Sequence, residues 1–371
     1  MENHFYRDTW AEVDLNAIKH NIKQMKMIYQ SPKKVYAVVK ANGYGHGDVE
    51  VAKAALEAGA DQLAVALLDE GIRLRKHIPD TPILVLGRIR PRDAQIAAWH
   101  NLTVTVFQAD WVVEARQYLH SNLNVHIKFD TGMNRLGIRT AAEAYDVLKE
   151  LKSTSIEITG VYSHLATADE DERTHLEKQL KRFRQYIEEF KPQLPEEIEF
   201  HIGNSAGAMR FKDSMYDAVR FGIGMYGLYP SELVKEQTGI PLKPAFSLIS
   251  QLSHIKKINP GETISYGATY TALEEEWVGT VPIGYGDGWI RKLQGFEVII
   301  DGKKYPIVGR ICMDQFMVKL DRYIPIDTKV TIIGENNGEF VSTDDVANHL
   351  ETINYEIPCM INERVPRVYF E

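Results

Sequence analysis

The sequence has little cysteine and no clustered metal-ligand motif. Its 371 residues include only two cysteines, Cys312 and Cys359. Two cysteines this far apart in the chain do not suggest a disulfide framework, and no Cys-x-x-Cys pair or Cys/His cluster has the spacing of a zinc site. We therefore expect a reducing compartment and no bound metal.

Long apolar runs are also missing. No stretch reaches the roughly 18 apolar residues that a membrane span requires. The opening segment, MENHFYRDTWAEVD, carries charges throughout and has no apolar core of signal-peptide length. These features predict a cytoplasmic protein with no membrane partner.

The sequence also lacks a concentrated basic patch. The net charge is −8 and the pI is near 5.9. The densest basic run, residues 178–184, is more easily interpreted as the solvated face of a helix. Because an acidic protein without a basic patch is not attracted to polyanions, we expect no nucleic-acid partner.

The remaining sequence alternates short β-branched runs with longer amphipathic stretches, which is typical of a parallel sheet wound through right-handed crossovers. Eight such runs fit a closed eight-stranded β/α barrel of the TIM type better than an open doubly wound sheet. No Gly-x-Gly-x-x-Gly motif follows the first run. The predicted strands are 35–40, 62–67, 82–86, 102–107, 123–130, 156–164, 198–202 and 217–221.

The pattern changes near Pro241, where alternating strands separated by Gly, Asn and Pro turns begin. We expect a barrel domain over residues 1–240 and a mostly β domain over 241–371. The alternating stretch 9–14 precedes the first barrel strand and is a candidate to pair with the β domain. The strands predicted in that domain are 247–258, 277–283, 296–301, 316–320 and 329–334.

Polar residues stand where several predicted barrel strands end, which is where such barrels place their active sites. Lys40 ends the first strand. A lysine at a strand end is most often a solvated surface group, but the preceding run 35–39 is of the buried type. Burial removes hydration and favours the neutral amine that imine chemistry requires. Lys40 is therefore a candidate to bind a carbonyl cofactor.

Other strand ends add weaker evidence. His164 ends the sixth strand and is equally compatible with a histidine satisfied at the edge of the core. Arg220 lies in the eighth strand, where its guanidinium would need an anionic or acceptor partner. Small residues at 204–207 and 222–224 follow strands seven and eight, where barrels often bind phosphate. Each segment alone could be a tight turn, but together they indicate a phosphorylated carbonyl cofactor.

Five motifs resemble those of one family, the bacterial alanine racemases, which are fold-type III pyridoxal phosphate enzymes. The resemblance spans nearly the whole chain, and its first motif is long enough to be highly specific. The motifs are AVVKANGYGHG at 37–47, DTGMNRLG at 130–137, VRFGIGMYG at 219–227, ISYGA at 264–268 and GRICMDQ at 309–315.

The resemblance implies a role for each matching residue. Lys40 would hold pyridoxal 5′-phosphate as an aldimine and act as one acid–base group, and Tyr266 would act as the other from the opposite face of the amino acid. The active site would be shared across a homodimer, with Tyr266 and Met313 supplied by the partner. The remaining roles are phosphate binding by Tyr44, Ser205, Gly222, Ile223 and Tyr355 with Asn204 beside them, His164 near the cofactor ring, Arg220 at the pyridine nitrogen, substrate carboxylate binding by Arg135 and Met313, and a carbamylated Lys128 next to Arg135.

The expected activity is interconversion of L-alanine and D-alanine, which supplies D-alanine for peptidoglycan. Two alternatives stay open: a non-catalytic pyridoxal phosphate-binding homeostasis protein and a fold-type III amino-acid decarboxylase. The first would lack a counterpart to residues 241–371. The second would be expected to show a Cys/Asp signature in the β domain and a glycine-rich phosphate loop, and the sequence has neither.

Overall fold

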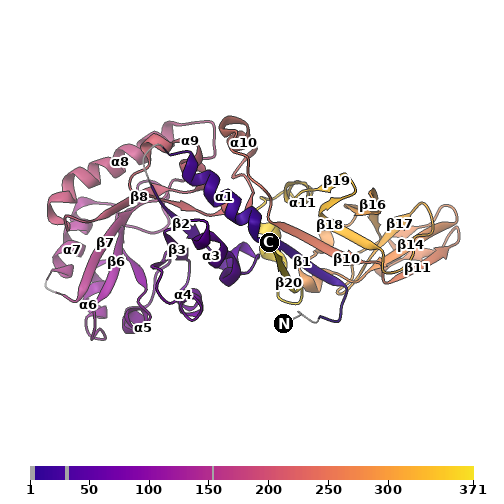
Figure 1. Ribbon diagram of the computed structural model, residues 1–371, viewed down its shortest axis with the longest axis horizontal. Helices are drawn as coiled ribbons and strands as arrows, with labels where there is room; N and C mark the ends of the chain where they lie inside the picture. The colour runs from indigo at the N-terminus through magenta and orange to yellow at the C-terminus, as the bar shows by residue number, and fades with distance from the viewer. Residues whose placement is uncertain (1–4, 30–32, 153) are drawn as a thin grey trace. The chain divides into compact units, whose positions relative to one another are not determined.

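The computed structural model describes residues 5–29, 33–152 and 154–371, which form two compact units. The first, which we call the β unit, consists of residues up to Leu15, Tyr44–Gly47 and Ala245–Glu371. The second, the barrel unit, consists of Asn16–Gly43 and Asp48–Pro244. Figure 1 shows the chain coloured from its N-terminus to its C-terminus.

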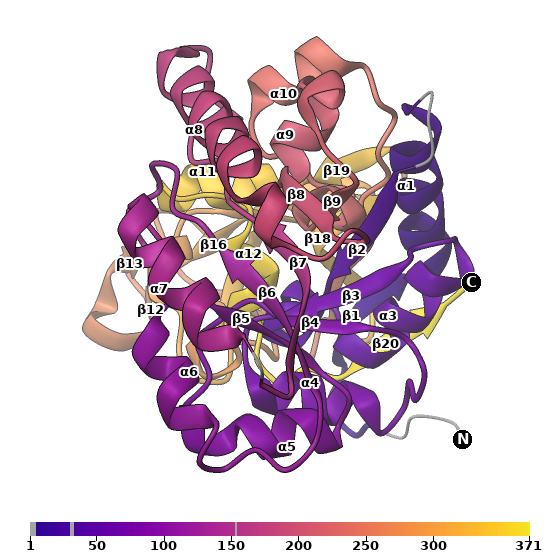
Figure 2. The same ribbon diagram turned by 90° about the vertical axis from the view of Figure 1, so that its left-hand side faces the viewer.

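Eight parallel strands close the barrel unit, which confirms the predicted fold class. The first and last strands pair directly, with Tyr36 opposite Arg220. Figure 2 shows the strands surrounded by helices. The strands are β2 (Lys34–Val38), β3 (Gln62–Val65), β4 (Ile83–Val85), β5 (Thr103–Val106), β6 (Leu123–Lys128), β7 (Ile156–Tyr162), β8 (Glu199–Gly203) and β9 (Ala218–Phe221).

Several of the surrounding helices begin at a residue whose side chain caps the helix N-terminus. Thr140 accepts a hydrogen bond from the backbone N–H of Glu143 at 3.2 Å, and the Glu143 carboxylate bonds back to the N–H of Thr140, forming a capping box. Ser231 caps its helix in a similar way through Val234. The helices of this unit are α1 (Leu15–Met27), which begins at the end of the β unit, α3 (Asp48–Glu57), α4 (Leu68–Arg75), α5 (Ala94–Trp99), α6 (Ala109–Ala115), α7 (Ala141–Leu151), α8 (Thr174–Phe190), α9 (Ser205–Arg210) and α10 (Glu232–Thr238).

The β unit is built on a ten-stranded sheet in which β1 (Thr9–Asp14) lies between β10 (Phe246–Gln251) and β20 (Arg367–Phe370). Its core contains Trp289, Phe316 and other fully buried apolar side chains. The other elements are β11 (His254–Ile258), β12 (Thr263–Ile264), β13 (Tyr270–Thr271), β14 (Glu276–Val281), β15 (Glu297–Ile300), β16 (Lys303–Val308), β17 (Phe316–Leu320), β18 (Lys329–Asn336), β19 (Glu339–Val341), α11 (Thr343–Leu350) and α12 (Glu356–Met360).

One predicted strand of the β unit is two strands. Residues 247–258 divide into β10 and β11, because the chain changes partners between them: Leu252 N–H donates to Thr328 and Ser253 N–H donates to Thr280. β10 pairs with β18, whereas β11 pairs with β14. Within the described residues, no helix is both long and apolar enough to cross a membrane.

Candidate active site

Lys40 follows β2 and opens a left-handed turn. It is half-buried, and the next three residues, Ala41, Asn42 and Gly43, all have φ between 52° and 59°. This conformation costs about 1–2 kcal/mol for each residue with a side chain, so other bonds must hold it. Gly43 N–H donates to Val39 at 2.9 Å.

The buried carboxylate of Glu70 also holds this turn through hydrogen bonds. Glu70 accepts the N–H of Ala41 at 2.6 Å through one oxygen, and the N–H groups of Ala66 and Leu67 at 2.8 and 3.0 Å through the other. Three charge-assisted hydrogen bonds therefore tie the start of α4 to the residue after Lys40. This arrangement fixes the backbone from which the Lys40 side chain extends.

Four cationic side chains gather at the carboxyl ends of the barrel strands. Lys128 ends β6 and is buried, and burial lowers its pKa to about 8, with Arg135, Arg220 and Lys40 adding to the decrease. Asp130 opposes that decrease. A concentration of positive charge of this kind favours an anionic ligand.

Arg220 is buried at 3% exposure, and its partners in the structure are neutral. Its Nη2 lies 2.7 Å from the Ser163 carbonyl oxygen and 3.1 Å from Nδ1 of His164. Because arginine can only donate, His164 must accept at Nδ1 and is therefore neutral. Burial, followed by the charge of Arg220, lowers the pKa of His164 well below its usual value, which agrees with that assignment.

Ser205 brings the two small-residue segments together. Its Oγ accepts the backbone N–H groups of Gly222 at 3.0 Å and Gly224 at 3.4 Å. The Ser205 hydroxyl hydrogen is therefore available to donate to an anion. Ile223 is buried and begins a 3-10 helix, Ile223–Tyr226, whereas the Asn204 Oδ1 caps α9 through Gly207 N–H at 3.0 Å.

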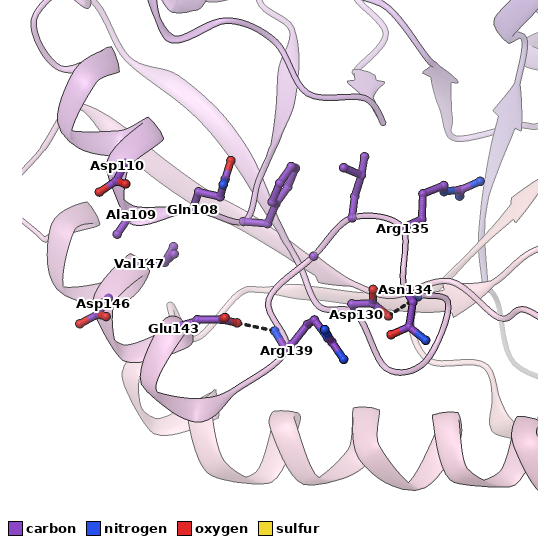
Figure 3. Close-up of a pocket in the computed structure, with 13 residues that line it drawn as sticks. Gln108, Ala109, Asp110, Asp130, Asn134, Arg135, Arg139, Glu143, Asp146 and Val147 are labelled. Carbon is purple, nitrogen blue, oxygen red and sulfur yellow. Dashed lines mark hydrogen bonds between the residues drawn. The ribbon is translucent and has the colours of Figure 1, made fainter.

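Arg135 is carried by a loop whose two ends are joined. The N–H of Asp130 donates to Ile138 at 2.8 Å, and the N–H of Ile138 donates to Lys128 at 2.9 Å. The Asp130 carboxylate accepts the N–H groups of Gly132 and Asn134. Arg135 is among the residues that line a hollow of about 560 Å³, and Figure 3 shows its side chain directed away from Glu143 and Asp146, which line the same hollow.

Tyr44 and Tyr355 lie together in the β unit, with ring centroids 6.3 Å apart. Tyr44 is buried, and burial raises the pKa of its phenol, with a further contribution from Cys359. A phenol that keeps its proton can donate a hydrogen bond to an anion. This pair connects residues that are more than three hundred positions apart in the sequence.

Tyr266 and Met313 are also in the β unit, on adjoining backbone segments. Ser265 Oγ donates to the carbonyl of Arg310 at 2.5 Å, and the Met313 carbonyl accepts the N–H of Gly286 at 2.8 Å. The side chains themselves are open, with 71% of Tyr266 and 52% of Met313 exposed. The backbone is therefore held while both side chains remain available.

Comparison with known proteins identifies the family. The family model for the alanine racemase N-terminal domain matches residues 13–230, and that for the C-terminal domain matches residues 245–369. The chain belongs to the alanine racemase family. The resemblance inferred from the motifs, and the racemase class expected from it, are thereby confirmed.

Individual members of the alanine racemase family match over full length. The alanine racemase of Anoxybacillus flavithermus is 52% identical, with 100% of this chain and 97% of the relative covered. That of Geobacillus stearothermophilus is 51% identical, with 99% and 95% covered. The crystal structure of the Bacillus anthracis enzyme with bound L-Ala-P has a TM-score of 0.97 at 47% identity, covering 99% of this chain and 96% of that one.

The predicted site residues of this family member fall into two sets. The barrel unit holds Lys40, Lys128, Arg135, His164, Asn204, Ser205, Arg220, Gly222 and Ile223, and the β unit holds Tyr44, Tyr266, Met313 and Tyr355. Sequence reasoning missed Glu70, His126, His201 and Tyr162. A signal for His126 existed: Asn124, His126 and Lys128 alternate along β6, so that one face of a barrel strand is entirely polar.

Proposed function

We propose that the protein interconverts L-alanine and D-alanine with pyridoxal 5′-phosphate as its cofactor. The observation that carries this proposal is the cluster of Lys40, Lys128, Arg135 and Arg220 at the carboxyl ends of the barrel strands. The full-length relatives at about 50% identity, each named alanine racemase, support the substrate.

The residues present fit the proposed cofactor. Lys40 supplies an amine at a clamped strand end, and Ser205 offers a hydroxyl hydrogen beside the N–H groups of Gly222 and Gly224. Gly222, Ile223, Tyr44 and Tyr355 complete the set that we assign to the phosphate, with Asn204 beside it. His164 would lie near the ring.

Arg220 is the residue that we assign to the pyridine nitrogen. Burial lowers its pKa to about 10, so the guanidinium remains charged at neutral pH. A group that keeps its protons leaves the ring nitrogen unprotonated. The cofactor, when bound, would acidify the substrate Cα–H by withdrawing electrons, and Arg220 would moderate that effect, which disfavours side reactions.

Two opposed groups would move the proton. Racemisation removes the Cα proton from one face and returns a proton to the other, so a single fixed base is poorly placed for both steps. Lys40 Nζ would act on one face and the Tyr266 phenol on the other. Arg135 and Met313 would hold the substrate carboxylate between them.

The deciding experiment is to purify the protein, confirm visible absorbance from bound cofactor, and follow the optical rotation of L-alanine. We expect the rotation to decay to zero, because enantiomers have equal free energies. Unchanged rotation with a fully loaded protein would overturn the proposal.

The non-catalytic alternative is disfavoured, because the pyridoxal phosphate-binding homeostasis proteins lack a counterpart to residues 241–371. Here residues 245–369 match the alanine racemase C-terminal domain. A role for the product D-alanine in peptidoglycan synthesis is part of the proposal. The cytoplasmic location stays a prediction.

A homodimer with shared active sites is proposed because Tyr266 and Met313 are so exposed. Complementation tests it. Mixed from unfolded chains, inactive Lys40→Ala and Tyr266→Phe variants should recover about a quarter of wild-type activity, since half of the randomly assorted dimers are hybrids and each hybrid holds one intact site. If no activity returns although hybrids are detected by mass, each chain builds its own site.

Carbamylation of Lys128 is a further part of the proposal. The neutral amine attacks carbon dioxide, a C–N bond forms and a proton leaves, so an amine whose pKa is lowered to about 8 is suited to the reaction. The resulting anion would face Arg135 and Arg220 rather than repel them.

Incubation with ¹³C-bicarbonate should give a carbamyl NMR signal in the wild type that is absent from Lys128→Ala. The signal should also decline as the pH falls below about 8, because the reactive neutral amine becomes protonated. Lys53→Ala, which changes an exposed lysine paired with Glu50, is the matched control and should keep the signal. A wild type without the signal contradicts the assignment.

A further inference from the structure

In the barrel interior, Arg220 is hydrogen-bonded to a pair of histidines that the proposed reaction does not use. Arg220 Nη1 lies 2.5 Å from Nδ1 of His201, and Nε2 of His201 lies 3.0 Å from Nδ1 of His126. All three side chains are buried. Barrel interiors are normally filled by layers of branched apolar side chains, so a polar row of this kind needs an explanation.

The two hydrogen bonds that join Arg220, His201 and His126 can be donated in only one direction, from Arg220 towards His126. Arginine has no acceptor, so Nδ1 of His201 must accept and its proton must be on Nε2. That proton is then donated to Nδ1 of His126, which places the His126 proton on Nε2. The direction follows from donor chemistry alone and requires both rings to be neutral.

The charges around the two rings agree with that requirement. Burial, followed by the charge of Arg220, lowers the pKa of His126 to about 3. The same two causes lower the pKa of His201 well below its usual value. Neither ring can therefore take a proton at neutral pH and become a second donor toward Arg220.

The position of His126 is built into the two strands around it. A Cβ at Gly160 would lie 2.6 Å from Cε1 and Nε2 of His126, so only glycine leaves room for the imidazole. The pairing of β6 with β7 shifts register between Val125 and His126, which brings Gly160 opposite the ring. His201 is held by Tyr162, whose ring stacks on it at 4.8 Å.

At its far end, the hydrogen-bonded row Arg220–His201–His126 reaches a hollow of about 440 Å³, because His126 is one of the residues that line it. Residues that begin the barrel strands, including Lys34, Gln62 and Thr103, line it together with His126. The hollow is therefore at the N-terminal end of the barrel. An acceptor there, such as water, can take the last proton of the row without disturbing its direction.

We propose that His126 is a positioning residue for Arg220: by accepting from His201 it fixes the tautomer that lets His201 accept from Arg220. This inference rests on the proposed function for its catalytic consequence only. Without an acceptor at position 126, the His201 Nε2–H is buried and unpaired. The alternative tautomer would direct an N–H at Arg220 and displace the guanidinium.

Two variants separate this role from packing. His126→Asn keeps an acceptor near the place of Nδ1, whereas His126→Leu keeps the bulk and removes the acceptor. We expect His126→Leu to lower kcat about 10- to 100-fold, the range for loss of the hydrogen bond between His201 and the charged Arg220, with little change in KM for alanine. His126→Asn should stay within about threefold of the wild type. Thermal unfolding checks that both variants are folded.

The direct readout is the tautomer of His201 in ¹⁵N-histidine-labelled protein, assigned by the signal lost in His201→Gln. Wild type and His126→Asn should show the proton on Nε2, and folded His126→Leu should lose that single state. Gly160→Ala should produce the same loss by displacing the His126 ring.

Several results would overturn the proposal: a wild-type proton on Nδ1 of His201, an unchanged tautomer in His126→Leu, or equal loss of kcat in the Leu and Asn variants. If the wild type does not racemise alanine, the proposed function fails, but the tautomer measurement still decides the role of His126.

Discussion

Replacing Lys40 with alanine is expected to lower racemisation by at least about 10⁴-fold, because the change removes an acid–base group and the attachment point of the cofactor together. The visible absorbance of the bound cofactor should disappear from the dialysed protein. The fold should persist, because the clamp on the following turn uses backbone N–H groups and Glu70 rather than the Lys40 side chain. The optical rotation of L-alanine and the absorbance spectrum measure the two effects.

Lys53→Ala is the control for Lys40→Ala, since it removes an exposed lysine from the neighbouring helix α3. It should retain full activity and full absorbance. Substantial racemisation by dialysed, folded Lys40→Ala would show that another residue carries the cofactor, and the assignment would have to be abandoned.

Tyr266→Phe is expected to lower racemisation in both directions equally, by about 10²–10⁴-fold, since it removes one of two proton-transfer groups. The two directions must fall together because the enantiomers have equal free energies. Lys40 would still act on its own face of the substrate. In deuterium oxide, one enantiomer should therefore exchange its Cα hydrogen faster than it is converted to the other.

Nuclear magnetic resonance of the Cα proton, combined with chiral chromatography, measures exchange and conversion in one sample. Tyr323→Phe, a change at a tyrosine of similar exposure in the same unit, is the matched control and should behave as the wild type. Full racemisation by Tyr266→Phe would remove Tyr266 from the proposed pair of bases but leave the cofactor assignment intact.

The barrel could be predicted from the sequence because it alternates short runs with amphipathic stretches, and most of the eight runs are followed by an interval long enough for a helix. The β unit was harder to predict. The alternating stretch 247–258 does not reveal that the polypeptide changes partners at Leu252 and Ser253, since that change depends on which strands lie alongside. Local pattern defines a strand but not its neighbours.

The site shows the same limit. Lys40, His164 and Arg220 could be recognised because β/α barrels place their active sites at the carboxyl ends of their strands. Tyr44 and Tyr355 could be paired only through the family resemblance, because nothing local joins residues so far apart. His126 and His201 escaped attention because a buried histidine is ordinary until its hydrogen-bond partner is known.

The place of β1 in the sheet has a consequence for how this protein can be divided. Because β1, from the start of the chain, lies between β10 and β20, a gene fragment that begins at residue 245 would encode a sheet with its penultimate strand missing. Tyr44–Gly47 would be absent as well. The β unit is thus not a cassette that recombination could move as one continuous piece, and attempts to express it alone must supply β1 in trans or by circular permutation.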